Sequence, residues 1–129
     1  MITTDFDKLS FHDSSIEKIE RIENTITIEF KGAFISKDHP DSEGRDWWVN
    51  EGKLRLLNVF GEEAKFWYDD KEGKPHPKPE FPLDEITNLD IESGFFKFGG
   101  FLEREPWVEW NVKANQYEIE VISKHEIHS

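Results

Sequence analysis

The chain has 129 residues, among them eleven Phe, five Trp and two Tyr, and its formal net charge is −12. This length is typical of one domain, and the aromatic residues are sufficient for a hydrophobic core, so we expect one folded domain over residues 1–129 and not a disordered chain. A chain this acidic repels nucleic-acid phosphates and anionic lipid surfaces, because both are bound mainly through Lys and Arg.

The sequence contains no cysteine, which excludes disulfides and thiolate metal sites and fits a reducing compartment. Its first residues lack the basic start and apolar run of a secretory signal peptide. No stretch of the sequence approaches the roughly 18 apolar residues that a membrane-spanning helix needs. We therefore expect a cytoplasmic protein that binds neither nucleic acid nor membrane.

Alternation of apolar and polar residues recurs along the chain and predicts β-strands. Residues 13–22 also fit a short helix capped by Ser14, but the turn at residues 23–24 leads directly into an alternating segment and favours a bulged strand in a hairpin. In chain order, the clear alternating segments are 25–30, 53–59, 64–69, 86–91, 95–98, 107–112 and 116–122.

Short polar breaks at residues 50–52, 61–63 and 113–115 predict turns between these strands. Short strands separated by short turns are typical of antiparallel sheet. We predict a mostly-β single domain with an antiparallel sheet of about seven or eight strands, as one sheet or two packed sheets, and little helix. An α+β fold is the alternative.

Two stretches are too long and polar for turns. Residues 36–46 contain no large apolar side chain. Residues 69–82 contain four prolines, which cannot donate to a sheet ladder. Long loops in small domains are often functional, and the alternative is a disordered surface excursion. Gly99 and Gly100 predict a bend or bulge within a strand.

A search for catalytic motifs gives a negative result. The sequence has no G-x-x-x-x-G-K-[ST] and no G-x-S-x-G, and neither Gly44 nor Gly73 lies in a calcium-loop register. The five histidines lack the spacing of a helical zinc site. We predict no enzyme activity, no cofactor and no metal. A catalytic carboxylate pair stays open, because 28 acidic residues make any one pair uninformative.

Aromatic residues occur in adjacent or alternating positions in three predicted strands. In each group one ring should face the core and another should face outward. Outward Trp and Tyr side chains can anchor a protein partner or stack on a sugar, unless a second layer covers them. The groups are Trp47 with Trp48, Phe66 with Trp67 and Tyr68, and Trp107 with Trp110.

The acidic residues are unevenly distributed. Residues 80–109 contain eight acidic and two basic residues, and the segments 36–46 and 62–72 are also acidic. If these regions share a face, they form a binding surface for a cationic partner, although surface carboxylates also serve solubility. The candidate partner-binding residues are Asp38, Asp41, Glu43, Asp46, Trp47, Asp69, Asp70, Glu72, Glu103 and Glu105.

The opening segment contains a polar turn between two apolar residues. Asp13 and Ser14 are turn formers, and Phe11 and Ile16 can anchor the turn from either side. The structural interpretation is that His12 forms a hydrogen bond with a neighbouring backbone group. The alternative is that His12 contacts a ligand.

This opening, with Leu9, Phe11, His12, Asp13, Ser14 and Ile16 followed by an amphipathic hairpin, resembles small bacterial immunity proteins of polymorphic-toxin and contact-dependent growth inhibition systems. Segments 52–59 and 107–122 are also similar to that pattern. The resemblance implies a non-enzymatic binder that neutralises a toxin from a neighbouring cell, often a nuclease with a basic surface. The motif itself is structural, so it implies no toxin-contacting residues.

Charge and resemblance together predict an immunity protein that binds a cognate, basic, nuclease-type toxin and covers its active surface. The alternative is a small-ligand or carbohydrate-binding module. That module would use exposed rings among Trp47, Trp48, Trp67 and Trp107.

Overall fold

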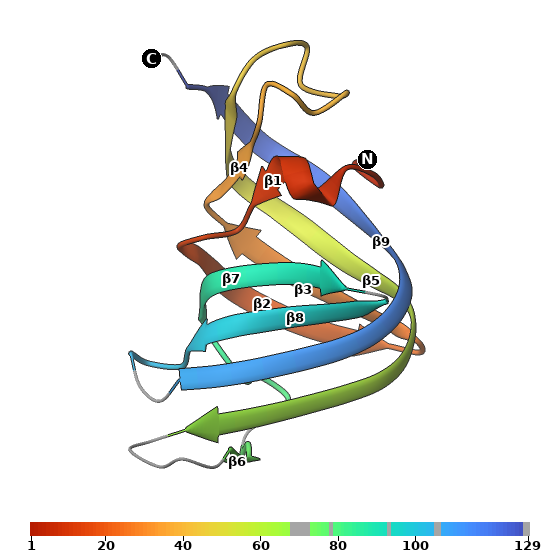
Figure 1. The fold of residues 1–129 in the computed structure, drawn as a ribbon, viewed down its shortest axis with the longest axis vertical. Helices are drawn as coiled ribbons and strands as arrows, with labels where there is room; N and C mark the ends of the chain where they lie inside the picture. The colour runs from red at the N-terminus through yellow and green to blue at the C-terminus, as the bar shows by residue number, and fades with distance from the viewer. Residues whose placement is uncertain (68–72, 78, 93, 105–106, 128–129) are drawn as a thin grey trace.

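The computed structural model describes residues 1–67, 73–77, 79–92, 94–104 and 107–127. Within these ranges it shows one antiparallel sheet of nine strands and one 3-10 turn, η1 (Phe6–Lys8), which confirms the mostly-β prediction (Figure 1). No helix in the described ranges has the length and apolar character to cross a membrane. The strands are β1 (Leu9–Ser10), β2 (Ser14–Ile22), β3 (Thr25–Lys31), β4 (Ala33–Ile35), β5 (Trp47–Trp67), β6 (Lys74–Pro75), β7 (Glu85–Glu92), β8 (Phe95–Phe101) and β9 (Trp107–Glu126).

The segment that allowed both a helix and a strand is strand β2. It pairs with β3 in a hairpin and carries a bulge between Ile16 and Lys18. Glu23 occupies the turn with a φ of 54°, in the left-handed region. The bulge explains the spacing of three between Ile16 and Ile19, because an inserted residue interrupts strict alternation. Ile22, at the end of the strand, is exposed.

Strands β5 and β9 form a long two-stranded ribbon, with 21 and 20 residues respectively. They pair from Trp47 opposite Glu126 to Trp67 opposite Trp107. The predicted turns at residues 50–52, 61–63 and 113–115 are therefore wrong, because all three segments lie inside continuous strands. The interruptions in the sequence pattern mark irregularities in the ribbon and not its ends.

The irregularities of β5 and β9 lie opposite each other. In β9 the buried positions are even-numbered up to Ala114, whereas Tyr117 and Ile119 continue the inward face at odd positions. In β5 Asn58 has a φ of 56°, and the register shifts between Val59 and Gly61. Bulges increase local bending, and the ribbon curves strongly along its length (Figure 1).

The sheet closes on itself through the ribbon. The first half of β5 pairs with β3, and the first part of β9 pairs with β8. Between them, β3 pairs with β2, β2 with β7, and β7 with β8. Successive neighbours therefore run β5-β3-β2-β7-β8-β9 and return to β5. One sheet thus supplies both walls around a single core.

The core confirms the expected division of the aromatic pairs. Trp110 is fully buried, and Phe66 and Trp47 pack against the core from the partly buried rim. Their strand neighbours Trp48 and Trp67 project from the opposite face, as alternation in a strand requires. Tyr68 lies outside the described residues. The largest fully buried side chains also include Phe30, Phe98, Ile28, Leu54, Leu56, Leu83 and Ile86.

The turn at residues 11–14 fixes the contact between β2 and β7, which itself has only two residue pairs. The backbone N–H of Asp13 donates to the carbonyl of Ile86 at 2.8 Å, and Nδ1–H of His12 donates to the carbonyl of Thr87 at 2.7 Å. Phe11 and Ile16 are both buried. This confirms the structural interpretation of His12. The hydroxyl of fully buried Ser14 donates to the carbonyl of Gly32 and not to a nearby amide.

The bulge expected near Gly99 and Gly100 lies on the neighbouring strand. The register of β7 against β8 shifts between Ile86 and Asn88, so Thr87 is the extra residue and faces the two glycines. A Cβ on Gly100 would overlap the carbonyl oxygen of Glu85. The glycines therefore permit a close backbone approach, which allows β7 to bulge toward His12.

We predict that Gly100→Ala lowers the free energy of unfolding by at least about 3 kcal/mol, because backbone must move to accommodate the methyl group. The matched control is Gly61→Ala in β5, where the nearest atom is Cδ of the flexible Lys113 side chain, at 3.0 Å. Its effect should stay within about 1 kcal/mol. Urea unfolding of both variants measures the difference, and equal effects would contradict the close approach.

Candidate functional site

The loop of residues 36–46, between β4 and β5, has a defined conformation. The backbone N–H of Ser36 donates to the carbonyl of Lys8 at 2.9 Å. The hydroxyl of buried Ser42 lies 2.8 Å from two carbonyl oxygens of the same loop. Nε1–H of Trp47 donates to the carbonyl of Ser42 at 2.8 Å. The loop is therefore a packed part of the domain and not a disordered excursion.

His39 joins this loop to the N-terminal segment. The residue is 2% exposed, its Nε2–H donates to the carbonyl of Thr4 at 3.0 Å, and its Nδ1 accepts from the backbone N–H of Asp41 at 3.0 Å. These two bonds require the neutral ring with its proton on Nε2. This bond joins the N-terminal segment, which contains Asp5 and Asp7, to the acidic loop.

We call this region the acidic end and define it by Asp5, Asp7, Asp38, Asp41 and Glu43. All five residues are exposed. Within the described ranges, the carboxylates of Asp5, Asp38, Asp41 and Glu43 form no ion pair, and Asp7 forms only a loose pair with Lys8 at 3.7 Å. Their negative charge is therefore available to a partner.

The outer face of β2, β3, β5 and β9 has a different charge pattern. Acidic and basic residues alternate across its strands, and they form ion pairs. Nζ of Lys18 lies 3.3 Å from the carboxylate of Glu20, and Nη2 of Arg55 lies 2.7 Å from that of Glu120. The hydrogen bond from Arg55 lowers the pKa of Glu120. Charge on this face is largely compensated locally.

The structure gathers half of the predicted partner-binding residues. Asp38, Asp41, Glu43, Asp46 and Trp47 belong to the loop or the strand that follows it. The carboxylate of Asp46 accepts the backbone N–H of Lys37 at 2.7 Å, and the Trp47 ring faces inward with Nζ of Lys124 4.2 Å from its centroid. These last two residues hold the loop in place.

Glu103 is separate from that group. It is exposed in the turn after β8, where its backbone N–H donates to the carboxylate of Asp84 at 3.2 Å. This turn lies in the lower part of Figure 1, whereas the loop of residues 36–46 lies at the top. The remaining predicted residues, Asp69, Asp70, Glu72 and Glu105, lie outside the described residues.

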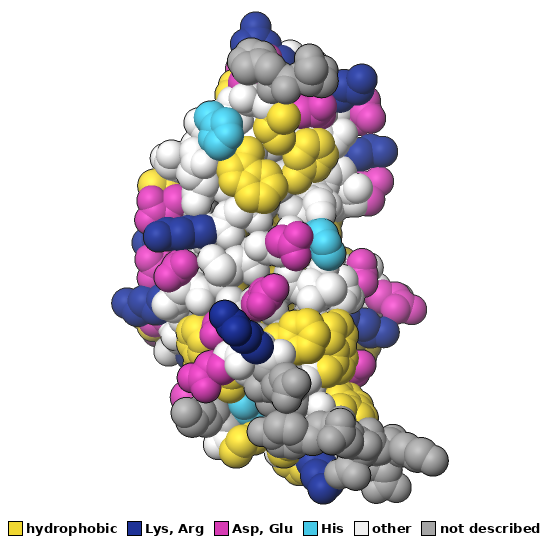
Figure 2. Space-filling model, turned by 90° about the vertical axis from the view of Figure 1, so that its left-hand side faces the viewer, with side chains coloured by type: hydrophobic (Ala, Val, Ile, Leu, Met, Phe, Trp, Pro, Cys, Tyr) yellow, Lys and Arg dark blue, Asp and Glu magenta, His cyan; other side chains and the backbone are white. Residues whose placement is uncertain are grey.

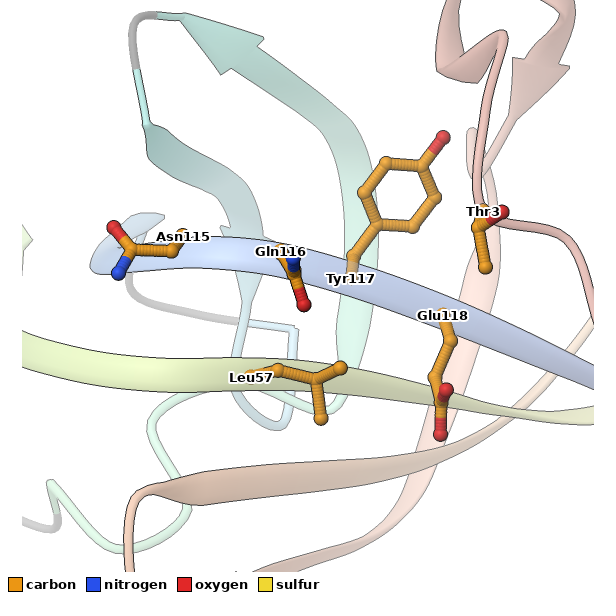
Figure 3. A pocket seen from close by; sticks show the side chains of 6 residues that line it. All are labelled: Thr3, Leu57, Asn115, Gln116, Tyr117 and Glu118. Atoms are coloured by element: carbon orange, nitrogen blue, oxygen red, sulfur yellow. The ribbon is translucent and has the colours of Figure 1, made fainter.

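A groove of about 460 Å³ lies at the bend of the ribbon (Figure 3). Gln116 and Glu118 project from one side of β9, and Tyr117 projects from the other. The Tyr117 ring packs against Phe6, with centroids 5.1 Å apart. Burial, together with Asp5 and Asp7, raises the pKa of Tyr117. The groove is lined by Thr3, Leu57, Asn115, Gln116, Tyr117 and Glu118.

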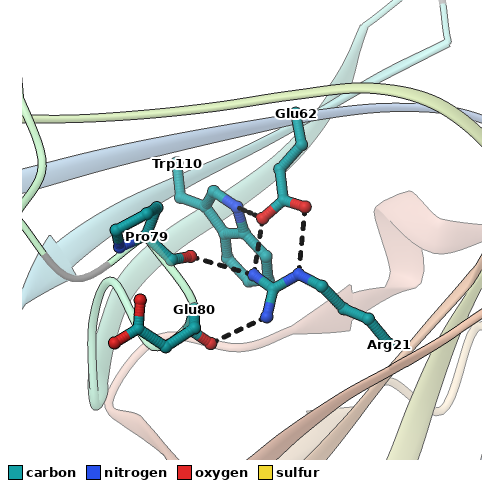
Figure 4. A network of polar contacts seen from close by, with 5 residues as sticks. All are labelled: Arg21, Glu62, Pro79, Glu80 and Trp110. Carbon is teal, nitrogen blue, oxygen red and sulfur yellow. Dashed lines mark hydrogen bonds and ion pairs between the residues drawn. The ribbon is translucent and has the colours of Figure 1, made fainter.

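A second pocket, of about 370 Å³, is lined by Arg21 and Glu62, which form an ion pair (Figure 4). Nε and Nη2 of Arg21 donate to the carboxylate of Glu62 at 3.0 and 2.5 Å, and the same guanidinium donates to the carbonyls of Pro79 and Glu80. Glu62 also accepts Nε1–H of Trp110 at 2.9 Å. The donors of Arg21 are thus engaged by the chain itself, so this pair stabilises the fold and does not form an anion site.

Sequence reasoning missed both the histidine contact and the Arg21–Glu62 pair. Each joins residues far apart in the chain, and no local pattern marks them. The groove had one signal, because Asn115 and Gln116 are consecutive polar residues where an alternating strand would place one inward apolar residue. That signal also fits the turn predicted there.

Comparison with protein-family models, with curated proteins and with solved structures found no match. Within the described ranges, no group of three or more His, Asp or Glu side chains is arranged to hold a metal ion. Function therefore has to be inferred from the acidic end and the groove themselves.

We predict that Glu62→Gln lowers the free energy of unfolding by about 2 kcal/mol, because it leaves the partly buried Arg21 guanidinium without its carboxylate. Glu63→Gln removes the same charge from the next residue, whose 62%-exposed side chain pairs with Lys65, and should cost about 0.5 kcal/mol or less. Chemical denaturation compares the two variants. Equal losses would show that the Arg21–Glu62 pair has no structural role.

Proposed function

We propose that this chain is an immunity protein, a non-catalytic binder that neutralises a basic, nuclease-type toxin by covering its active surface. The observation that supports this is the acidic end, where Asp38, Asp41 and Glu43 are exposed on a loop held by backbone and side-chain hydrogen bonds. Among the described residues these three carboxylates form no ion pair. A surface that recognises nucleic-acid phosphates is rich in Lys and Arg. Fixed carboxylates are complementary to such a surface.

The rigidity of the loop favours binding for a second reason. A flexible acidic segment loses conformational entropy when it orders on a partner, which weakens the complex. Here the loop is ordered in advance through Ser42 and His39. The unpaired charges should raise the association rate with a basic protein and make that rate sensitive to salt. Such an inhibitor acts in the cytoplasm, where it meets the incoming toxin.

The test is a triple variant, Asp38→Asn with Asp41→Asn and Glu43→Gln, measured against the toxin encoded beside this gene. We expect the association rate to fall by about tenfold at low salt and to lose much of its salt dependence, because steering charge is removed. Stopped-flow association and co-expression survival give the two readouts.

The matched control removes three carboxylates that are paired with lysines, through Glu20→Gln, Glu63→Gln and Glu92→Gln. It changes net charge equally and should reduce the association rate much less. If both triple variants behave alike, the acidic end is not the binding surface. If no complex forms with the neighbouring toxin at micromolar concentration, the proposed function is wrong.

A second candidate is the small-ligand or carbohydrate-binding module. It is favoured by an outward aromatic row in which Trp67 lies opposite Trp107 and Trp107 lies opposite Phe101. The Phe101 and Trp107 rings meet edge to face, with centroids 5.3 Å apart. Figure 2 shows hydrophobic side chains gathered in two groups on one face, with charged side chains and a histidine between them.

For this candidate we expect sugars to quench Trp fluorescence to the same extent at low and high salt, because stacking on an aromatic ring involves little net charge. Trp107→Ala should abolish the quenching, and Trp47→Phe, at an inward-facing ring, should leave it unchanged. Absence of quenching at millimolar concentrations of common monosaccharides and their oligomers would exclude the module.

A further inference from the structure

The groove at the bend contains a carboxylate without a hydrogen-bond donor. The Glu118 side chain is 28% exposed, and its nearest base is Nη1 of Arg55 at 3.7 Å, beyond hydrogen-bond distance. Arg55 instead donates through Nη2 to Glu120 at 2.7 Å. Across the described part of the chain, no N–H or O–H group donates to the Glu118 carboxylate. The Glu118 carboxylate is thus partly exposed and only loosely paired, so it can accept charge-assisted hydrogen bonds from a donor that enters the groove.

The surroundings of Glu118 suit a cation on an aliphatic stem. Leu57 provides an apolar surface, and the side chains of Asn115 and Gln116 provide amide oxygens that can accept hydrogen bonds. The groove lining contains no basic side chain among the described residues. Asp5 and Asp7 add negative potential nearby, as shown by their effect in raising the pKa of Tyr117. Arg and Lys combine an apolar stem with a charged head.

A sugar fits this lining less well. Carbohydrate sites commonly use an aromatic ring as a platform. The aromatic residue of the groove, Tyr117, projects from the side of β9 opposite Gln116 and Glu118 (Figure 3). Its ring is engaged with Phe6 and Phe96. The face that Glu118 presents to the groove therefore has carboxylate and amide acceptors but no platform.

The groove is also continuous with the acidic end. Thr3 lines the groove, and the carbonyl of the next residue, Thr4, accepts the hydrogen bond from His39. The backbone of Ile2 pairs with that of Ile119 in β9, at 2.8 and 2.9 Å. The N-terminal segment thus connects the two features, so one partner can contact both.

We propose that this groove takes up an arginine side chain of the basic partner protein, with the guanidinium on the Glu118 carboxylate and the stem along Leu57. The inference rests on the proposed function for the nature of the partner. Arginine is favoured over lysine because its planar fork supplies two parallel donors to one carboxylate and further donors to the amide oxygens of Asn115 and Gln116.

The test uses the capped peptide acetyl-Gly-Arg-Gly-amide as probe, titrated into ¹⁵N-labelled protein and followed by NMR. We expect shifts confined to residues 115–118, Leu57 and the side-chain amides of Asn115 and Gln116. The citrulline peptide has nearly the same shape without the charge and should give no saturable shifts. Glu118→Gln should weaken binding of the arginine peptide about tenfold, and Glu109→Gln, which removes an exposed carboxylate elsewhere on β9, should retain it.

A second variant controls for a loss of binding that results from a fold defect in Glu118→Gln. Asn115→Arg places a cation at the groove from within the chain and should suppress binding of the peptide although Glu118 is intact. The proposal is overturned if arginine and citrulline peptides bind equally, if the shifts fall outside the groove, or if Glu118→Gln and Glu109→Gln have the same effect. Groove shifts produced by a monosaccharide in place of the arginine peptide would also overturn it.

These outcomes separate the groove from the proposed function. If the toxin complex forms and Glu118→Gln leaves its affinity unchanged, the groove inference fails and the immunity function stands. If the arginine peptide occupies the groove but the neighbouring gene product forms no complex, the immunity function fails and the groove remains a cation site.

Discussion

The closure of the sheet between β2 and β7 is the constraint on which the rest of the structure depends. Only two residue pairs join these strands, yet they complete the circuit that encloses the core. Donation from His12 and Asp13 to the backbone of β7 strengthens this short contact. The bulge in β7 presents the Thr87 carbonyl to His12, and it lies opposite Gly99 and Gly100 of the neighbouring strand β8. The two most distinctive local motifs of the sequence therefore serve one structural joint, and this accounts for both without any chemistry of a bound ligand.

The bend of the β5–β9 ribbon is the second requirement for closure, and it creates the groove. The β5–β9 ribbon lines both walls of the core, and the positions of β9 that point inward switch from even to odd numbers at the bend. The switch occurs at Asn115 and Gln116. Two consecutive exposed polar residues then project outward beside Leu57, where a regular strand would place one inward. The groove is thus a direct consequence of the geometry that shapes the core. Apart from Tyr117, its lining residues are free to vary in chemistry, because they do not themselves fill the interior.

The sequence predicted the parts of this structure that depend on local periodicity. Alternation identified most of the strands, and it predicted one inward and one outward ring in each aromatic group. The structure shows Trp110 and Phe66 as the inward rings of their groups. It failed at the ribbon bend, since a break in alternation has the same appearance whether the chain turns back or bulges and continues. Contacts between residues far apart in the chain could not be predicted from local periodicity. The bond between His39 and Thr4 spans 35 positions, and the pair of Arg21 with Glu62 spans 41. No local pattern distinguishes His39 from an exposed loop histidine, so the order of the acidic loop could not be inferred.

The distribution of ion pairs is what distinguishes a binding role for the net charge from a purely solubilising one. Solubility requires only that carboxylates be exposed, and paired or unpaired acids serve it almost equally. Here Glu20, Glu92 and Glu120 form ion pairs with basic side chains. Asp38, Asp41 and Glu43 form none among the described residues, and they lie on one short, fixed loop. Like charges held close together repel, which opposes folding unless a cation relieves them. A rigid cluster of this kind is least costly when a basic surface compensates it, so the ordering of the loop and the lack of ion pairs at its three carboxylates both favour a protein partner.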